Sequence, residues 1–369
     1  MWLLAAVLGA LTVATGLLSG GAALDVLART APVLVFLVAI TVLAELADIA
    51  GVFDLAAHRA ARLARGRTLA LFGLVVVLTS ATTILLSLDT TAVLITPVVL
   101  ALAAQLGVSP LPFALAAVWL ANTASLLLPV SNLTNLLALG HLDVTTAAYV
   151  RDLALPALVA IAVTAAVLLV WQRTALTGRY DVPTVDRPAD RVLFTGTATA
   201  CLLLVPALLA GVEVAVAAVS SAALAVLLFL WRRPSALRPA LVPWRLVVLV
   251  VGLFLVVGAA GPLGVDELLR QGVGGQLRTA FVAAGGANAV NNLPAYLAVE
   301  RVVPHDHLLA VLLGVNLGPL VTPWASLATL LWADRCRARG VSISWIRYGA
   351  AGLVLVPLLL VTTVVTLPG

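Results

Sequence analysis

Apolar stretches of about 20 residues recur along the whole of this sequence, and a helix of that length crosses the hydrocarbon core of a bilayer. Hydrophobic residues make up 63% of the chain and charged residues only 10%, whereas a soluble domain carries about 25% charged residues. The sequence therefore predicts an all-α integral membrane protein. The expected spans are residues 2–19, 30–48, 111–140, 152–171, 192–210, 213–231, 245–262, 308–333 and 349–367.

Two further apolar regions, 69–105 and 279–303, are interrupted near their middles by polar residues. The first break runs from Ser87 to Thr91, and the second from Asn288 to Pro294. Each half is too short to cross the membrane comfortably, so we expect two re-entrant hairpins, each entering and leaving on one side.

The positions of the arginines support this topology. The chain has no Lys, so all 21 basic residues are Arg. With the two hairpins in place, four Arg clusters fall on one side of the membrane, and the positive-inside rule makes that side cytoplasmic. Because the basic residues lie in short loops beside membrane spans, we expect a multi-pass protein of the cell membrane and no nucleic acid partner. The clusters are Arg59, Arg62, Arg65 and Arg67; Arg173, Arg179, Arg187 and Arg191; Arg232, Arg233, Arg238 and Arg245; and Arg335, Arg337, Arg339 and Arg347.

The same topology divides the chain into two halves of opposite orientation, 1–171 and 192–369, joined by a cytoplasmic linker at 172–191. Such an inverted repeat is common in secondary transporters. The halves also match in sequence. Asn122 pairs with Asn316, Pro129 with Pro323 and Leu133 with Leu327, and the first hairpin tip is aligned by pairing Asp89 with Asn292.

All seven Asn residues of the chain lie in the second hairpin and in spans 111–140 and 308–333. A buried amide in a bilayer is costly unless it has a partner or a ligand. Prolines in the same stretches interrupt the helical hydrogen-bond ladder, so we expect two discontinuous helices and a polar site near the midplane. The candidate substrate- or ion-binding residues are Ser87, Asp89, Thr90, Thr91, Asn122, Thr123, Ser125, Ser131, Asn132, Asn135, Asn291, Asn292, Asn316, Thr322, Ser326 and Thr329.

Asp89 is the only acidic residue expected at mid-depth, where a carboxylate marks an ion or proton path. We therefore expect it to carry the coupling proton or to bind the coupling cation, with Glu45 and Asp48 as the next candidates. Acids near span ends, Glu300 among them, are expected to be solvated or paired with nearby Arg.

We expect no catalytic residues, metal site or cofactor. Cys201 and Cys336 form no motif by their spacing, and the four His residues lie at expected loops or helix ends, where solvated positions are favoured over ligands. An enzyme in the membrane would need a catalytic pair or a metal cluster at depth. With one deep carboxylate and no deep His, the sequence favours a secondary transporter over an enzyme or a structural protein.

At these residues the chain resembles the arsenite permease family of the ion transporter superfamily, which also holds divalent-anion/sodium symporters and sodium/proton antiporters. Four stretches carry most of the resemblance: Ser87–Leu102, Ala121–Asn135, Asn291–Leu297 and Asn316–Trp332, the last with the sequence N-L-G-P-L-V-T-P-W-A-S-L-A-T-L-L-W. The family usually has Asn immediately before the tip Asp, whereas this chain has Leu88. Two spans precede the first hairpin and three precede the second, so the chain is expected to begin at the family's second span.

The resemblance implies export of arsenite or antimonite, which are neutral trihydroxy species at neutral pH, against an inward flow of protons. A sodium- or proton-coupled anion symporter, dicarboxylate-like, and a sodium/proton antiporter stay open as alternatives. The partners that follow are a small inorganic substrate, a coupling proton or sodium ion, and the bilayer, with a cytoplasmic ATPase subunit and a homodimer also open. No phosphate-binding Gly-rich motif occurs, so we do not expect the chain itself to hydrolyse ATP.

Overall fold

The computed structural model describes residues 2–182, 189–260 and 264–368. The linker 172–191 and the expected span 245–262 therefore lie partly outside the described residues. The regular structure within these ranges is helical. The α-helices are α1 (Trp2–Ala14), α2 (Gly20–Ile49), α3 (Val52–Leu63), α4 (Thr68–Leu85), α5 (Leu88–Thr90), α6 (Thr96–Gln105), α7 (Leu111–Thr123), α8 (Leu133–Leu142), α9 (Thr146–Trp171), α10 (Arg191–Leu209), α11 (Val214–Arg232), α12 (Trp244–Ala260), α13 (Val265–Gly272), α14 (Gln276–Ala289), α15 (Asn292–Val299), α16 (Leu308–Leu317), α17 (Leu327–Ala338) and α18 (Trp345–Val364).

Short helical turns complete the described structure. A π-helical turn at Thr91–Ile95 joins α5 to α6, and 3₁₀ turns lie at Pro129–Ser131, Arg173–Leu176, Pro234–Ala236, Pro239–Leu241 and His305–His307. Eight segments of the described chain are long and apolar enough to cross a membrane. The expected first span, 2–19, is wrong in length, because α1 has only 13 residues and spans about 20 Å.

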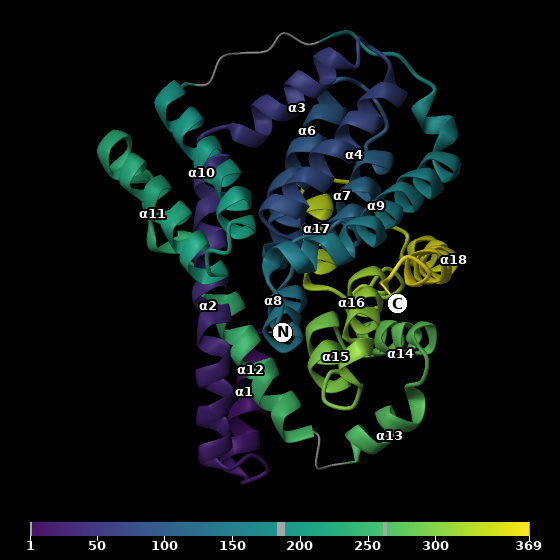
Figure 1. The fold of residues 1–369 in the computed structure, drawn as a ribbon. Coiled ribbons are helices and arrows are strands. Elements are labelled where there is room, and N and C mark those ends of the chain that lie inside the picture. Colours follow the sequence, from purple (N-terminus) through teal and green to yellow (C-terminus); the bar gives the residue numbers. More distant parts are fainter. Residues whose placement is uncertain (1, 183–188, 261–263, 369) are drawn as a thin grey trace.

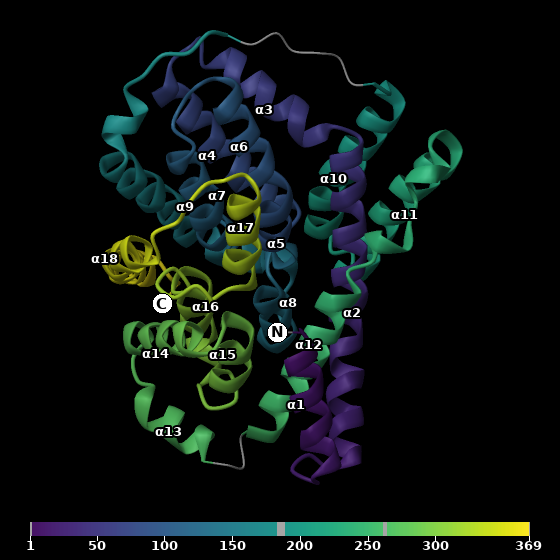
Figure 2. The same cartoon turned by 180° about the vertical axis from the view of Figure 1, so that it is seen from behind.

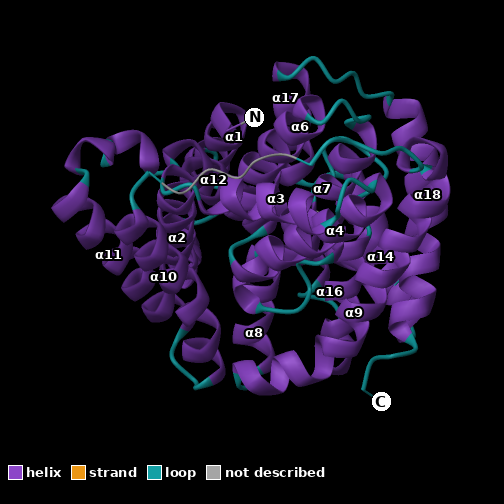
Figure 3. Cartoon of the chain, turned by 90° about the horizontal axis from the view of Figure 1, so that it is seen from above, coloured by secondary structure: helices purple, strands orange, loops and turns teal. Residues whose placement is uncertain are grey.

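The helices form two groups. Helices α1, α2, α10, α11 and α12 make a peripheral bundle at one side, and α3–α9 with α13–α18 make the larger body (Figures 1 and 3). Glycine lets α1 and α12 pack closely, since a Cβ at Gly252 would lie 2.4 Å from the carbonyl carbon of Ala5. Helix α12 also contacts the long helix α2 on one side and α15 of the larger body on the other.

The two hairpins enter from opposite ends of the molecule. Helices α4 and α6 lie towards one end of the molecule and α14 and α15 towards the other (Figures 1 and 2), while α5 at the first tip lies at mid-height (Figure 2). The expectation that each hairpin half is too short to span is wrong for the first hairpin. Its arms, Thr68–Leu85 and Leu88–Gln105, have 18 residues each and qualify as spans by length and composition. In the second hairpin, α14 has 14 residues and α15 only 8.

The backbone at the two hairpin tips is nearly identical. Leu86 has φ −121° and ψ −60°, and Val290 has φ −122° and ψ −53°; the extended residues that follow are Ser87 (165°, 167°) and Asn291 (162°, 157°). Ser87 therefore matches Asn291, and the expected pairing of Asp89 with Asn292 is wrong by one position. The residue that matches Asn292 is Leu88.

Both expected discontinuous helices are present, α7 with α8 and α16 with α17. Their interruptions, 124–132 and 318–326, are equal in length. The residues that restart the helix have similar extended backbones, φ −153° and ψ 141° at Asn132 and φ −139° and ψ 141° at Ser326. Helices α8 and α17 point away from the centre in opposite directions (Figure 2). The larger body is therefore an inverted repeat with two hairpins and two broken helices.

Two short helices that the sequence reading took for loops precede the hairpins. Helix α3 leads into α4 and α13 leads into α14, and each combines apolar and charged side chains. Both lie across the ends of the molecule rather than along its long axis (Figure 1). Such amphipathic helices suit the two surfaces of a membrane.

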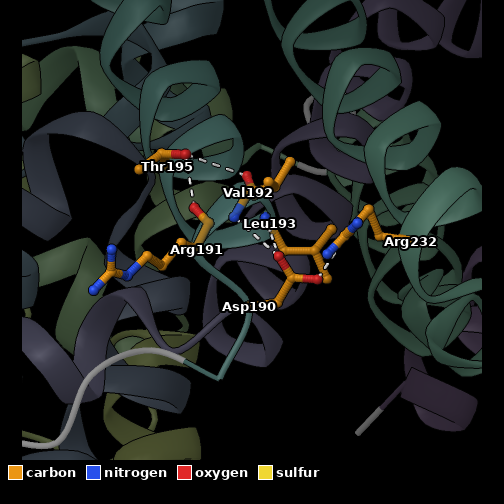
Figure 4. Close-up of polar contacts among 6 residues, drawn as sticks. All are labelled: Asp190, Arg191, Val192, Leu193, Thr195 and Arg232. Atoms are coloured by element: carbon orange, nitrogen blue, oxygen red, sulfur yellow. Dashed lines mark hydrogen bonds and ion pairs between the residues drawn. The ribbon is translucent and has the colours of Figure 1, made fainter.

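An ion pair closes one end of the peripheral bundle. The Asp190 carboxylate accepts hydrogen bonds from the backbone N–H groups of Val192 (2.9 Å) and Leu193 (3.1 Å) and pairs with Nε of Arg232 at 3.0 Å (Figure 4). The backbone N–H of Leu193 first, and then Arg232 and the N–H of Val192, hold the pKa of Asp190 below its usual range. The start of α10 is thereby tied to the end of α11.

Candidate functional site

The two hairpin tips and the starts of α8 and α17 line a partly open cavity of about 90 Å³. One face of α12 closes it. The polar side chains in its wall are Asp89 and Asn132 from the first half of the chain and Asn291, Asn292 and Ser326 from the second half. Residues more than 230 positions apart in sequence thus meet at one small polar site.

Helix N-termini point at this cavity from both halves. Asn132 starts α8, Asn291 starts α15 and Ser326 starts α17. The unpaired N–H groups of a helix start carry partial positive charge, so they favour anions and polar oxygen atoms. At α17 the Ser326 side chain does not cap the helix, and its buried Oγ has no hydrogen-bond partner within the described residues. This end of the cavity therefore presents hydrogen-bonding groups that a solute can use.

Asp89 is the acid of the cavity wall. Its Oδ1 is buried and has no hydrogen-bond partner among the described residues. An isolated carboxylate away from water is costly unless it is paired, so Asp89 needs a proton or a cation as its partner. The next candidates, Glu45 and Asp48, lie near the end of α2, in the electrostatic range of Arg335 rather than at the cavity.

Beside the cavity, an amide network joins the two broken helices. Asn316 on α16 accepts from Nδ2 of Asn132 and from Oγ1 of Thr134 (3.1 Å), and its own amide donates to Oδ1 of Asn135 (2.6 Å). Asn135 in turn donates to the Ser125 carbonyl at 2.6 Å. Asn316, with 1% of its surface exposed, thus holds the two halves together and does not line the cavity.

Several other expected site residues support the backbone. The Ser131 hydroxyl donates to the Ile84 carbonyl (2.8 Å), which holds the interruption between α7 and α8 against α4. Asn122 donates to the Val118 carbonyl of its own helix (2.9 Å), and its buried Oδ1 has no partner in the described chain. The remaining members make local contacts or lie buried in helices: Ser87 and Thr90 bond to each other, Thr91 bonds to Thr83, Thr123 to Thr164, Ser125 to the Asn122 carbonyl and Thr322 to the Asn288 carbonyl, and Thr329 is buried in α17.

Two features of the site were missed from the sequence. Asn288 accepts from the N–H groups of Val321 and Thr322 and donates to the Gly318 carbonyl, so it shapes the interruption between α16 and α17. The cavity wall from α12, Leu246, Leu249, Val250 and Leu253, is wholly apolar. These four residues have the spacing of one helical face. The other faces of α12 are apolar as well, so the sequence does not show which face lines the cavity.

A cavity with amide, hydroxyl and carboxylate side chains in its wall lies between two helical hairpins and two broken helices, in a chain whose described residues include eight membrane-capable segments. This arrangement defines a membrane transporter. More specifically, the chain belongs to the arsenical pump membrane protein family, whose model matches residues 5–368.

Known relatives agree with this assignment, and a solved structure has a similar fold. The arsenical pump membrane proteins of Yersinia enterocolitica and Escherichia coli K12 are each 30% identical over 358 residues, covering 88% of this chain and 83% of theirs. The fold is similar to that of the Alcanivorax borkumensis YdaH transporter, described as having an unusual topology, with a TM-score of 0.58 at 15% identity over 95% of this chain and 88% of that one.

Proposed function

We propose that this chain exports arsenite or antimonite across the cytoplasmic membrane in exchange for protons. The observation that carries the proposal is the size and chemistry of the central cavity. Its volume of about 90 Å³ equals the share of about three water molecules in the liquid. A neutral trihydroxy species is of that order, and its hydroxyl groups match the amides, the serine and the helix starts around it.

In this proposal, Asn132, Asn291, Asn292 and Ser326 bind the hydroxyl groups of the substrate. Asn side chains both donate and accept, as hydroxyl groups do, so one site can satisfy all three of them. Thr90, Thr91, Asn122 and the other expected polar residues act behind this layer, by holding the tips and breaks in shape. No metal or cofactor is needed for this binding.

Asp89 is proposed as the group that couples transport to the proton gradient. Its unpaired carboxylate faces the same cavity as the substrate. Proton binding at Asp89 and substrate binding beside it can exclude each other, because both change the hydrogen bonds of one small space. Such exclusion is a requirement for exchange rather than symport.

The proposed orientation places the Arg clusters, and therefore the first hairpin's open end, in the cytoplasm. The repeats then comprise 1–171 and 192–369, with 172–191 as a cytoplasmic linker. A cytoplasmic ATPase subunit, if one acts with this chain, would meet the Arg-rich face.

The alternative of a dicarboxylate-like symporter is less well supported. A dicarboxylate carries two negative charges that need cationic or multiple donor partners, whereas the described lining of this cavity contains the Asp89 carboxylate and no Arg or His. A sodium-coupled variant of either function differs in its ion requirement, which transport assays separate.

The test is arsenite uptake into everted vesicles from an efflux-deficient host, with and without the chain. We expect uptake to need a lumen that is acidic relative to the medium, to persist without sodium and to be inhibited by antimonite. Growth of the same host on arsenite should be restored by the chain. Sodium-dependent uptake of a dicarboxylate, with no effect on arsenite, would refute the proposal.

A further inference from the structure

A second and larger cavity lies on the side of the central site away from the Arg clusters. It has a volume of about 870 Å³ and is bounded by the first half of α2, the ends of α8, α12 and α15, the start of α11 and the loop after α15. Figure 1 shows these helix ends together in the lower half of the molecule. In the proposed orientation this cavity opens to the outside.

The two cavities are stacked along the same three helices. On α8, α12 and α15, a residue of the central cavity is followed four positions later by a residue of the large cavity, about 6 Å further along the axis. The pairs are Leu133 and Leu137 on α8, Val250 and Phe254 on α12, and Leu293 and Leu297 on α15. An apolar neck one helical turn deep therefore separates the polar central site from the large cavity.

The large cavity contains a cluster of charged and titratable groups: Asp25, His141, Glu213, Glu300, Arg301 and His305. Within it, Nδ1 of His141 lies 2.9 Å from Oε2 of Glu300, with 50% and 11% of the two side chains exposed. Arg301, the neighbouring arginine in the sequence, does not pair with Glu300, because its guanidinium donates to the Val257 carbonyl at 3.0 Å. The sequence interpretation of Glu300 as solvated or Arg-paired is therefore wrong.

The surrounding groups have other contacts. Glu213 accepts from the Ala215 N–H at the start of α11 (3.3 Å), and Nε2 of His305 contacts the His141 carbonyl at 3.0 Å. Asp25 faces the cluster from α2. The His141–Glu300 pair is thus a titratable pair that is open to the cavity on its His side and buried on its Glu side.

Two buried tyrosines lie between the Glu300 carboxylate and the central cavity. The Tyr296 phenol, one turn before Glu300 on α15, lies beside the Glu300 carboxylate and near Tyr149. The Tyr149 hydroxyl donates at 3.2 Å to the Leu126 carbonyl, which lies in the break between α7 and α8. The two buried phenols thus lie between the Glu300 carboxylate and the broken helix of the central site, and the Tyr296 hydroxyl has no hydrogen-bond partner within the described residues.

We propose that His141 and Glu300 form the outer proton-loading site of the transporter, inside a vestibule through which the substrate leaves. A proton from the outer solution converts the neutral imidazole and the carboxylate into an imidazolium–carboxylate pair. Transfer of that proton to Asp89, carried across the apolar neck by water or by the hydroxyl groups of the substrate, restores the neutral imidazole and leaves Asp89 as the neutral acid. This inference rests on the proposed proton-coupled export and assigns the residues that receive the proton.

The test measures arsenite uptake into everted vesicles at fixed outer pH while the lumen, which faces the vestibule, is set between pH 5.5 and 7.5. Proton occupancy of a loading site increases with the proton concentration in the lumen, so we expect uptake by the unmodified chain to rise as the lumen pH falls, by at most about a hundredfold for one site over two pH units. Glu300→Gln and His141→Gln should each reduce this dependence to less than about twofold. The double exchange His141→Glu with Glu300→His keeps both groups and should restore it. Glu213→Gln, in the same cavity, is the matched control and should keep the original profile.

The outcomes separate this inference from the proposed function. A flat profile in the unmodified chain would overturn proton coupling itself. A steep profile in both the unmodified chain and Glu300→Gln would overturn the loading site alone. Loss of transport in the single variants that the double exchange fails to restore would make the pair a structural contact and would also overturn the inference.

Discussion

The structure distinguishes two asparagines that the sequence treated alike, and a pair of alanine variants tests the distinction. Asn316→Ala removes three side-chain hydrogen bonds, with Asn132, Thr134 and Asn135. Each is worth about 0.6 kcal/mol in membrane proteins and about 1 kcal/mol in soluble ones. The expected loss is therefore about 2–3 kcal/mol of unfolding free energy. The three partners, each left with a hydrogen-bonding group unmet, push the loss towards the upper value.

Asn292→Ala should behave differently. The Asn292 side chain accepts one bond, from the Leu293 N–H at 2.9 Å, and that N–H also reaches Oδ1 of Asn291 at 3.3 Å. We expect a loss of stability below about 1 kcal/mol, together with at least about a tenfold loss of uptake, since tenfold corresponds to about 1.4 kcal/mol of substrate binding.

The assay combines unfolding in one detergent, followed by tryptophan fluorescence, with arsenite uptake normalised to the amount of folded protein. Equal destabilisation by the two variants would refute the division between a structural and a substrate-binding amide. A stable Asn316→Ala variant with poor uptake would reverse the assignment and make Asn316 the substrate ligand.

Three further predictions concern coupling, topology and the peripheral bundle. Asp89→Asn should lose proton-driven accumulation of arsenite in vesicles while keeping part of the downhill exchange, and full uphill transport by this variant would place coupling elsewhere. Single cysteines at Gly107 and Asp306, in a background without Cys201 and Cys336, should be labelled from opposite sides of the membrane; equal labelling from outside would refute the inverted hairpins. Because the pKa of Asp190 is lowered in the folded state, its contribution to stability is present above the ordinary carboxyl range and is lost as the pH falls through the lowered value. Asp190→Asn should therefore weaken the α10–α11 contact at neutral pH and remove this part of the acid sensitivity, as hydrogen exchange at Val192 and Leu193 would report; unchanged exchange would contradict it.

Much of the fold was predictable because a polar residue in a membrane-spanning stretch is costly, so its position marks a helix break or a site. Asn132, Asn291, Asn292 and Ser326 were expected near one site from their positions at helix breaks, and the structure brings them to one cavity. The expected alignment of the two hairpin tips was wrong by one residue because it compared side chains and not backbone conformation. Ser87 and Asn291 both start a helix, and only their dihedral angles show this.

Other features were beyond reach for definite physical reasons. The α12 wall carries no polar contrast, so its inward face could not be identified. Glu300 is followed directly by Arg301, and sequence proximity suggested an ion pair. In the folded chain the guanidinium donates to the Val257 carbonyl, and the Glu300 carboxylate lies beside His141, which is 159 positions earlier in the sequence. Contacts between separate helices decide both cases.

The unequal hairpins have a consequence for kinetics. The return arm of the first hairpin contains 18 residues and that of the second only 8, which correspond to about 27 Å and 12 Å of helix on the two sides of the cavity. The two end states of the cycle are therefore not mirror images, and the barriers to opening towards each face differ. The half-saturating concentration and the maximal rate measured from the two faces should be unequal, although the gradients alone fix the final distribution of the solute. An inverted repeat with arms of different length is thus expected to transport with different kinetic constants in the two directions of a reversible cycle.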